Sequence, residues 1–236
     1  MISYVQNSVL SKIDPIVGSA ALLVSSYVVG IICIGFGVLP ALVDLTGLNL
    51  LLTFILLVAH QQGDKRRLIW FAGLAYVIGF AAEVIGVQYG VLFGEYTYGR
   101  VLGPKLLGTP FLIGVNWTIL VLSVGVLLNK YAKKYNILTK SAVGATTLTA
   151  IDFLIEPVAT TLDMWSWIGN AVPAQNYLGW FFVSFIMFVL FFKMKINGSN
   201  KLAALSLGLI VLFFAVLNLC LETDVDIFVV KGGMIG

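Results

Sequence analysis

Three acidic residues, Glu83, Asp152 and Glu156, stand inside stretches of sequence that are otherwise apolar enough to cross a membrane. An ionised side chain is costly in hydrocarbon, so a membrane protein keeps one only where it is paired, protonated or used. These carboxyl groups are therefore the first candidates for chemistry in this chain.

Asp152 and Glu156 are four residues apart, which places them one turn apart on the same face of a helix. Two like charges this close in apolar surroundings resist double ionisation. We expect one of the two to hold a proton at neutral pH, as a stored acid beside a base. Glu83 either completes this group or forms a salt bridge with Arg100 or Lys105 of the loop that follows it, and both interpretations stay open at this point.

The elements that carry these residues are predicted to be membrane helices. Of the 236 residues, 60% are hydrophobic and only 11% are charged, and the mean hydropathy is +1.02. Runs of about 20 apolar residues span a bilayer, so we predict an all-α fold, a polytopic membrane helix bundle that forms one integral membrane domain over residues 1–236. The seven predicted spans are residues 16–39, 45–60, 68–87, 110–129, 141–158, 177–193 and 202–221.

The basic residues predict how the bundle is oriented. In a seven-span arrangement the loops 61–67, 130–140 and 193–201, which hold most of the Lys and Arg residues, fall on one side. The positive-inside rule places that side, and the N-terminus, in the cytoplasm, so we expect an integral protein of the cell (inner) membrane. The net charge of +3 reports this topology and does not indicate a nucleic-acid partner.

The polar residues of different spans are predicted to share one depth. Glu83 and Glu156 each lie 15 residues from the cytoplasmic start of their span, or roughly 22 Å along a helix. Asn116, Trp117 and Asn218 fall in the same outer third of the membrane. Such a layer is typical of a site, and water can enter it from the outer side. For the two asparagines, hydrogen bonds that hold helices together are an equally good interpretation.

Two loops on the outer side are rich in glycine and aromatic residues. Gly86, Gly90 and Gly94 repeat every four residues, which favours close packing of helices. Tyr96 and Tyr98 either alternate along an extended segment or belong to an interfacial belt.

The second outer loop follows the Asp152–Glu156 pair. Pro157 directly after Glu156 is expected to kink or end the helix. For Trp165, Trp167, Tyr177 and Trp180, membrane anchoring at the interface is the favoured interpretation, and stabilisation of a cation by the ring faces is the alternative.

The motifs of these two segments resemble the carotenoid biosynthesis membrane protein family of bacteria and archaea, whose characterised members are carotenoid 1,2-hydratases. The resemblance covers roughly residues 80–180. The matching positions are Ala82-Glu83, Gly86, Phe93-Gly94, Tyr96-Thr97-Tyr98, Leu102-Gly103-Pro104, Gly108, Pro110, Asn116-Trp117, Asp152, Ile155-Glu156-Pro157-Val158-Ala159, Trp165, Trp167, Pro173 and Gln175-Asn176-Tyr177.

The resemblance implies addition of water to the terminal C1=C2 double bond of an acyclic carotenoid such as lycopene or gamma-carotene. It also implies membrane lipid as the surroundings and association with other carotenoid enzymes. The chemistry needs a neutral carboxylic acid that protonates carbon 2, and a base that activates the water captured by the tertiary cation. It requires no metal, redox cofactor or nucleotide.

We assign the acid and base roles among Asp152, Glu156 and Glu83 as the catalytic residues, with Asn116 orienting the water. The expected substrate-binding residues are Asn116, Trp117, Tyr96, Tyr98, Trp165, Trp167 and Tyr177.

Two other functions remain open. A lycopene-type cyclase begins with the same proton transfer, and a proton-coupled transporter also uses intramembrane carboxylates, although the sequence shows no inverted repeat. A retinal protein is set aside because residues 202–221 contain no lysine, and a prenyltransferase because aspartate-rich motifs are lacking. His60, the one histidine, is expected to have a surface or capping role, and Cys33 and Cys220 to be inert.

Overall fold

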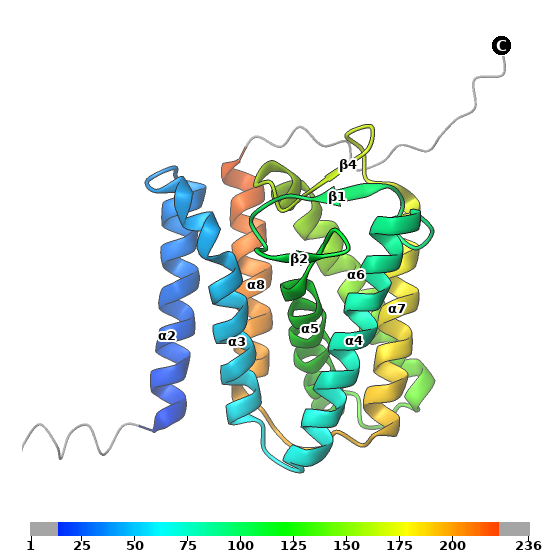
Figure 1. Cartoon of the computed structure of the whole chain (residues 1–236). Coiled ribbons are helices and arrows are strands. Elements are labelled where there is room, and N and C mark those ends of the chain that lie inside the picture. The colour runs from blue at the N-terminus through cyan, green and yellow to red at the C-terminus, as the bar shows by residue number, and fades with distance from the viewer. Residues whose placement is uncertain (1–13, 222–236) are drawn as a thin grey trace, which may run out of the picture.

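Seven long helices make up the computed structural model, which describes residues 14–221 (Figure 1). All seven are long and apolar enough to cross a membrane, so the predicted all-α integral membrane bundle is confirmed. Short π and 3-10 segments, η1 (Ile31–Gly35) and η2 (Pro40–Leu45), extend the first two helices, so that these spans run Pro15–Gly35 and Pro40–His60. The helices are α2 (Pro15–Gly30), α3 (Thr46–His60), α4 (Lys65–Tyr89), α5 (Phe111–Tyr131), α6 (Ile137–Thr161), α7 (Ala174–Lys193) and α8 (Lys201–Cys220).

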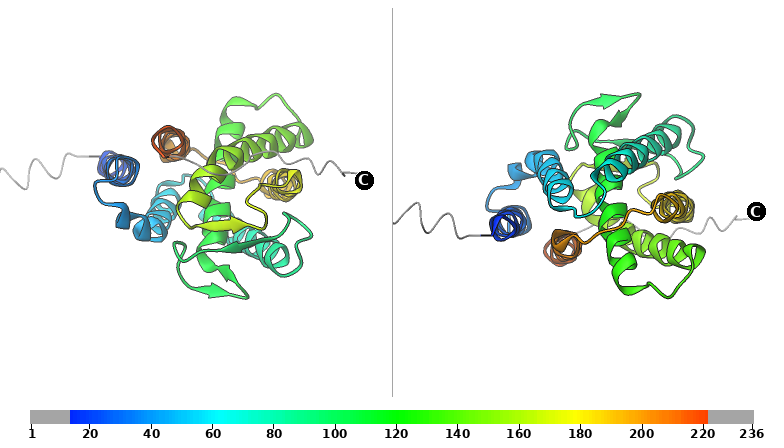
Figure 2. Two further views of the ribbon diagram at one scale, coloured as in Figure 1. Left: turned by 90° about the horizontal axis from the view of Figure 1, so that it is seen from above. Right: turned by 90° about the horizontal axis from the view of Figure 1, so that it is seen from below.

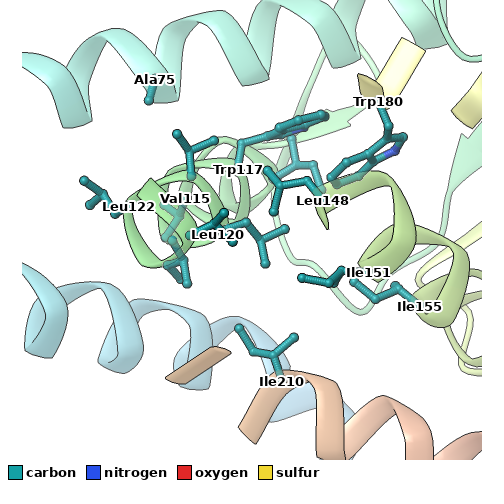
Figure 3. Close-up of a cluster of buried hydrophobic side chains, with 14 of the residues drawn as sticks. Ala75, Val115, Trp117, Leu120, Leu122, Leu148, Ile151, Ile155, Trp180 and Ile210 are labelled. Carbon is teal, nitrogen blue, oxygen red and sulfur yellow. The ribbon is translucent and has the colours of Figure 1, made fainter. Parts of the chain in front are cut away.

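Helix α5 lies at the centre of the bundle, as the views along the helices show (Figure 2). Every residue from 113 to 126 is buried except Asn116. The helices α4, α6 and α7 pack on one side of α5, while α3 and α8 pack on the other and α2 lies at the edge against α8 and α3. Side chains of α5, α6, α7 and α8 meet in a continuous apolar core around Trp117, Leu148 and Ile151 (Figure 3).

The three loops that carry most of the basic residues gather at one end of the bundle, as predicted (Figure 1). Gln62 N–H donates to the Ser199 carbonyl at 3.1 Å, and the Asn129 amide donates to the Ile196 carbonyl at 2.8 Å. Helix N-caps lie in the same loops; for example, Asp64 Oδ1 accepts from the Arg66 and Arg67 N–H groups, which satisfies donors left free at the start of a helix.

A short two-stranded ribbon covers the opposite end of the bundle (Figure 1). Strand β1 (Tyr96–Tyr98) pairs antiparallel with β4 (Trp165–Trp167), so that Tyr96 faces Trp167 and Tyr98 faces Trp165. Side chains alternate across a strand, and all four aromatic residues are therefore buried on one face. The strands β2 (Lys105–Leu106) and β3 (Thr109–Pro110) form a separate small hairpin before α5.

One local prediction is wrong, and one of two outcomes expected at another position is excluded. Only Gly86 of the glycine repeat packs inside a helix: Gly90 ends α4 in the left-handed conformation, and Gly94 also has a positive φ, so these two glycines permit turns that L side chains rarely adopt. A Cβ at Gly86 would lie 2.8 Å from the Tyr96 hydroxyl, so this glycine makes room for the ribbon. Of the two outcomes expected at Pro157, a kink or an end of the helix, the end is excluded, because α6 continues to Thr161.

Candidate active site

Asp152 and Glu156 lie on the face of α6 that packs against α7, and both are fully buried. One side chain of α7 joins them: Asn176 Nδ2 donates to Asp152 Oδ2 at 2.7 Å and to Glu156 Oε1 at 3.2 Å. Asp152 Oδ1 is also buried, and no group of the described residues donates to it. The pair is thus held by a shared amide and keeps one unused carboxyl oxygen.

The ribbon supplies two further donors to Glu156. Its Oε2 accepts from Trp165 Nε1 at 2.9 Å and from Trp167 Nε1 at 2.7 Å. Both indoles are buried, with 9% and 5% of their surface exposed. The interpretation of these two tryptophans as interfacial anchors is therefore wrong, because their N–H groups point inward to a carboxylate.

Glu83 on α4 is the centre of a second hydrogen-bond cluster. Its Oε2 accepts from the Tyr96 hydroxyl at 2.5 Å and the Tyr98 hydroxyl at 2.8 Å, and its Oε1 accepts from Trp117 Nε1 at 2.9 Å. The alternation of Tyr96 and Tyr98 on an extended segment is thus confirmed. Burial and then the charge of Glu83 raise the pKa of Tyr96 and Tyr98, so both phenols keep their protons and act as donors.

The salt bridge considered for Glu83 does not form. Arg100 instead pairs with Asp44 at 3.1 Å, and Lys105 Nζ donates to the Tyr98 carbonyl. Lys105 therefore supports the ribbon backbone from outside. Among the described residues, the side chains that donate to Glu83 are all neutral.

The two clusters share one aromatic wall. The ring centroids of Tyr96 and Trp167 are 5.0 Å apart, and those of Tyr98 and Trp165 are 6.0 Å apart. The predicted convergence of acids from separate helices is thus observed, since donors to Glu83 and donors to Glu156 are neighbours on one ribbon. Within residues 14–221 the ribbon covers the acids, and Glu83, Asp152 and Glu156 are at most 3% exposed, so the expected opening to water is not seen there.

The remaining predicted site residues lie in three different places. Trp117 lies inside the site, stacked on Trp180 with ring centroids 4.0 Å apart (Figure 3). Asn116 points to the other side of α5, where it lines a cavity. Tyr177 is half-buried against Phe153, and its hydroxyl has no hydrogen-bond partner among residues 14–221.

Asn218 and His60 have structural contacts. Asn218 Nδ2 donates to the Leu154 carbonyl at 2.8 Å, which links α8 to α6 as the helix-linking interpretation predicts. His60 Nε2 lies 2.9 Å from Ser19 Oγ and links α3 to α2. Among residues 14–221, no group of three His, Cys, Asp or Glu side chains is placed to hold a metal ion.

Asn176 is the residue whose role sequence reasoning missed. It stood in a recognised motif, Gln175-Asn176-Tyr177, but no function was assigned to it. The available signal was its position in the first turn of a helix that is antiparallel to the one carrying the acids. That position brings its amide to the depth of Asp152 and Glu156.

The sequence comparisons identify the family of the chain. A family model described as carotenoid biosynthesis protein matches residues 41–235. The chain belongs to the carotenoid biosynthesis protein family. A curated relative, the bisanhydrobacterioruberin hydratase of Haloarcula japonica, is 34% identical over 132 residues, which cover 51% of this chain and 44% of that protein. The chain therefore matches less than half the length of that relative, and no solved structure matches it.

Proposed function

We propose that this member of the family is a carotenoid hydratase that adds water to the terminal C1=C2 double bond of an acyclic end group. The observation that carries the proposal is the buried Asp152–Glu156 pair, bridged by Asn176 and with one carboxyl oxygen unused. Family membership and the name of the hydratase relative support the same chemistry.

The hydrogen bonds suggest how the two acids divide the work. Glu156 accepts from two indoles and an amide, and such donors favour a carboxylate that is ionised. Asp152 Oδ1 has no donor among the described residues, so this oxygen is free to carry a proton. We assign Asp152 as the acid that protonates carbon 2 and Glu156 as the base that accepts a proton from the attacking water.

The reaction balances without a redox partner. The alkene π electrons form the new C–H bond to carbon 2 with the proton of Asp152, which leaves a tertiary cation at carbon 1. Water adds to carbon 1 and passes a proton to Glu156. The faces of Trp165 and Trp167 stabilise the cation before water adds. Asp152 finally regains a proton from Glu156 or from solvent. Glu83 holds Tyr96, Tyr98 and Trp117 in place as a third, positioning carboxylate.

The proposal includes the orientation of the helix bundle in the membrane. With the basic loops in the cytoplasm, the ribbon and the acids lie toward the outer side of the cell membrane and the N-terminus lies inside. Labelling of single cysteines placed in the loop at Lys133 and in the loop at Leu107 tests this, because only the second is expected to react with an impermeant reagent in whole cells.

The deciding experiment is expression in a host that makes lycopene or gamma-carotene, followed by mass analysis of the pigment. A product heavier by one water supports the hydratase. A product of unchanged mass and altered absorption would identify a cyclase instead. Proton flux in liposomes without carotenoid would favour a transporter. Full hydration by the Asp152→Asn and Glu156→Gln variants would overturn the assigned roles.

A further inference from the structure

An apolar cavity of about 290 Å³ lies beside the site, between the α2–α3 pair and the helices α5 and α8. Its lining is mainly aliphatic and aromatic, and none of the side chains that line it is charged. The exceptions are a few polar groups, among them Asn116 of α5 and the Ser26–Asn49 pair, which bridges α2 and α3 at 2.9 Å. Such a space suits a hydrocarbon ligand far better than an ion or a sugar.

One wall of this cavity is shared with the candidate active site. Trp165 lines the cavity, and its indole N–H bonds Glu156 Oε2 at 2.9 Å. Ile155, the neighbour of Glu156 in α6, lines the same wall, and Asn116 faces the space from α5. A molecule in the cavity is therefore separated from the acids by the Trp165 ring and its neighbours.

The opposite part of the cavity borders surface that faces hydrocarbon. Val29, Leu45 and Leu48 line it and are 46%, 51% and 64% exposed. They belong to the two N-terminal spans, whose surface contacts lipid in a membrane-spanning bundle. A ligand dissolved in the bilayer can therefore reach the cavity sideways, between α2 and α3, without crossing water.

We propose that this cavity binds the acyclic hydrocarbon end of the carotenoid, which reaches the acids when the Trp165 ring turns aside. The inference rests on the proposed function. A water molecule occupies roughly 30 Å³ in the liquid, so the cavity has room for about ten groups of that size, which corresponds to the end of the chain and not to the whole polyene. The rest of the polyene lies in the bilayer beside Val29, Leu45 and Leu48. When the Trp165 ring turns aside, it breaks its bond to Glu156, while Trp167 continues to donate to the same oxygen.

The test fills the cavity without touching the acids. Gly30 lies in α2 and lines the cavity, and a Cβ built there points at the Phe213 ring, 3.1 Å away. Gly18 lies in the same helix, and a Cβ there meets nothing within 4 Å. Gly30→Leu and Gly18→Leu therefore carry the same change in helix propensity and differ in where the side chain goes.

The readout is the total carotenoid, lycopene plus its hydrated product, retained per protein after purification in detergent from a lycopene-producing host. Gly30→Leu is expected to retain at least fivefold less pigment than Gly18→Leu. A second pair, Val29→Phe at the cavity mouth and Val28→Phe on the adjacent lipid-facing position, repeats the comparison if Gly30→Leu fails to fold. Equal retention by folded members of either pair would overturn the cavity proposal.

Variants of the acids separate the two proposals. Asp152→Asn and Glu156→Gln are expected to retain pigment normally and to make no hydrated product. If they hydrate normally while Gly30→Leu still loses pigment, the cavity proposal stands and the proposed catalytic roles fall. If Gly30→Leu binds and hydrates normally while the acid variants are inactive, the catalytic roles stand and the cavity assignment falls.

Discussion

The two carboxylate clusters of this protein differ in how completely their oxygens are used. Glu83 accepts three hydrogen bonds from neutral side chains on two segments, strand β1 and helix α5, and such a saturated group stabilises structure. Asp152 and Glu156 share one amide, and Asp152 retains a buried oxygen without a donor. Saturation at one cluster and spare capacity at the other suggest that stability and chemistry are divided between them.

The largest effect is expected at the cluster with the unused oxygen, Asp152 and Glu156. Asp152→Asn keeps the shape and the bond to Asn176 but removes the transferable proton, so hydration is expected to fall by about 100- to 10,000-fold. The measurement is hydrated product per protein in carotenoid-producing cells. Retained unfolding temperature in detergent serves as the control, and near-normal activity would contradict the division of roles.

The next largest effect is expected when the shared amide, that of Asn176, is removed. Asn176→Leu has similar size and leaves both carboxyls without their common donor, so we expect kcat to fall by about tenfold or more while pigment retention is unchanged. A drop in pigment retention with normal turnover would indicate a role in binding instead. Gln175, the preceding residue, bonds loop carbonyls at the exposed surface, and Gln175→Leu is the matched control.

The saturated cluster is expected to respond in stability. Glu83→Gln keeps one acceptor oxygen but places an amide N–H₂ against a donor, which leaves a buried polar group unpaired and costs about 1–3 kcal/mol of unfolding free energy. Thermal unfolding in detergent measures this. The comparison would be reversed if Glu83→Gln kept full stability and abolished hydration.

A smaller effect separates the two indoles that donate to Glu156. Trp167→Phe and Trp165→Phe each remove one of two donors to the same oxygen. Because the other indole still satisfies that oxygen, each substitution is expected to cost about 0.5–1.5 kcal/mol of unfolding free energy. Only Trp165 also lines the cavity, so Trp165→Phe should change pigment retention more than Trp167→Phe. Equal changes in retention would remove the distinction.

The smallest effect is expected on the outer face of the ribbon. Thr97 and Ser166 are exposed and share one hydrogen bond at 3.1 Å between their hydroxyls. Thr97→Val should change the unfolding free energy by no more than about 0.5 kcal/mol and leave hydration unaltered. A large loss would mean that the exposed face, and not only the buried face, takes part in function.

The helices and the depth of the acids could be predicted because both depend on local sequence. Apolar run length sets the seven spans, and the spacing of Asp152 and Glu156 sets their common face. The shared face of Tyr96 and Tyr98 was one of two interpretations, and it depends on the two-residue period of a strand. Each of these inferences needs only residues that are near one another in the chain.

The partners of the acids could not be predicted in the same way. The pairing of Thr97 with Ser166 joins positions 69 residues apart, and no local pattern specifies it. Trp165 and Trp167 have the composition of interfacial anchors, and only the ribbon turns their N–H groups inward. Asn116 and Asn176 are both amides near the ribbon end of the bundle, yet Asn116 lines the cavity and Asn176 contacts the acids.

Both carboxylate clusters depend on the register in which β1 pairs with β4. The backbone bonds from Gly99 to Met164 and from Ile168 to Glu95 extend the pairing on both sides. A one-residue slip of either strand would exchange its inner and outer faces, so Thr97 or Ser166 would replace two aromatic donors together. Adding or deleting a single amino acid near the start of β1 or β4 should therefore harm this protein more than any conservative replacement within them.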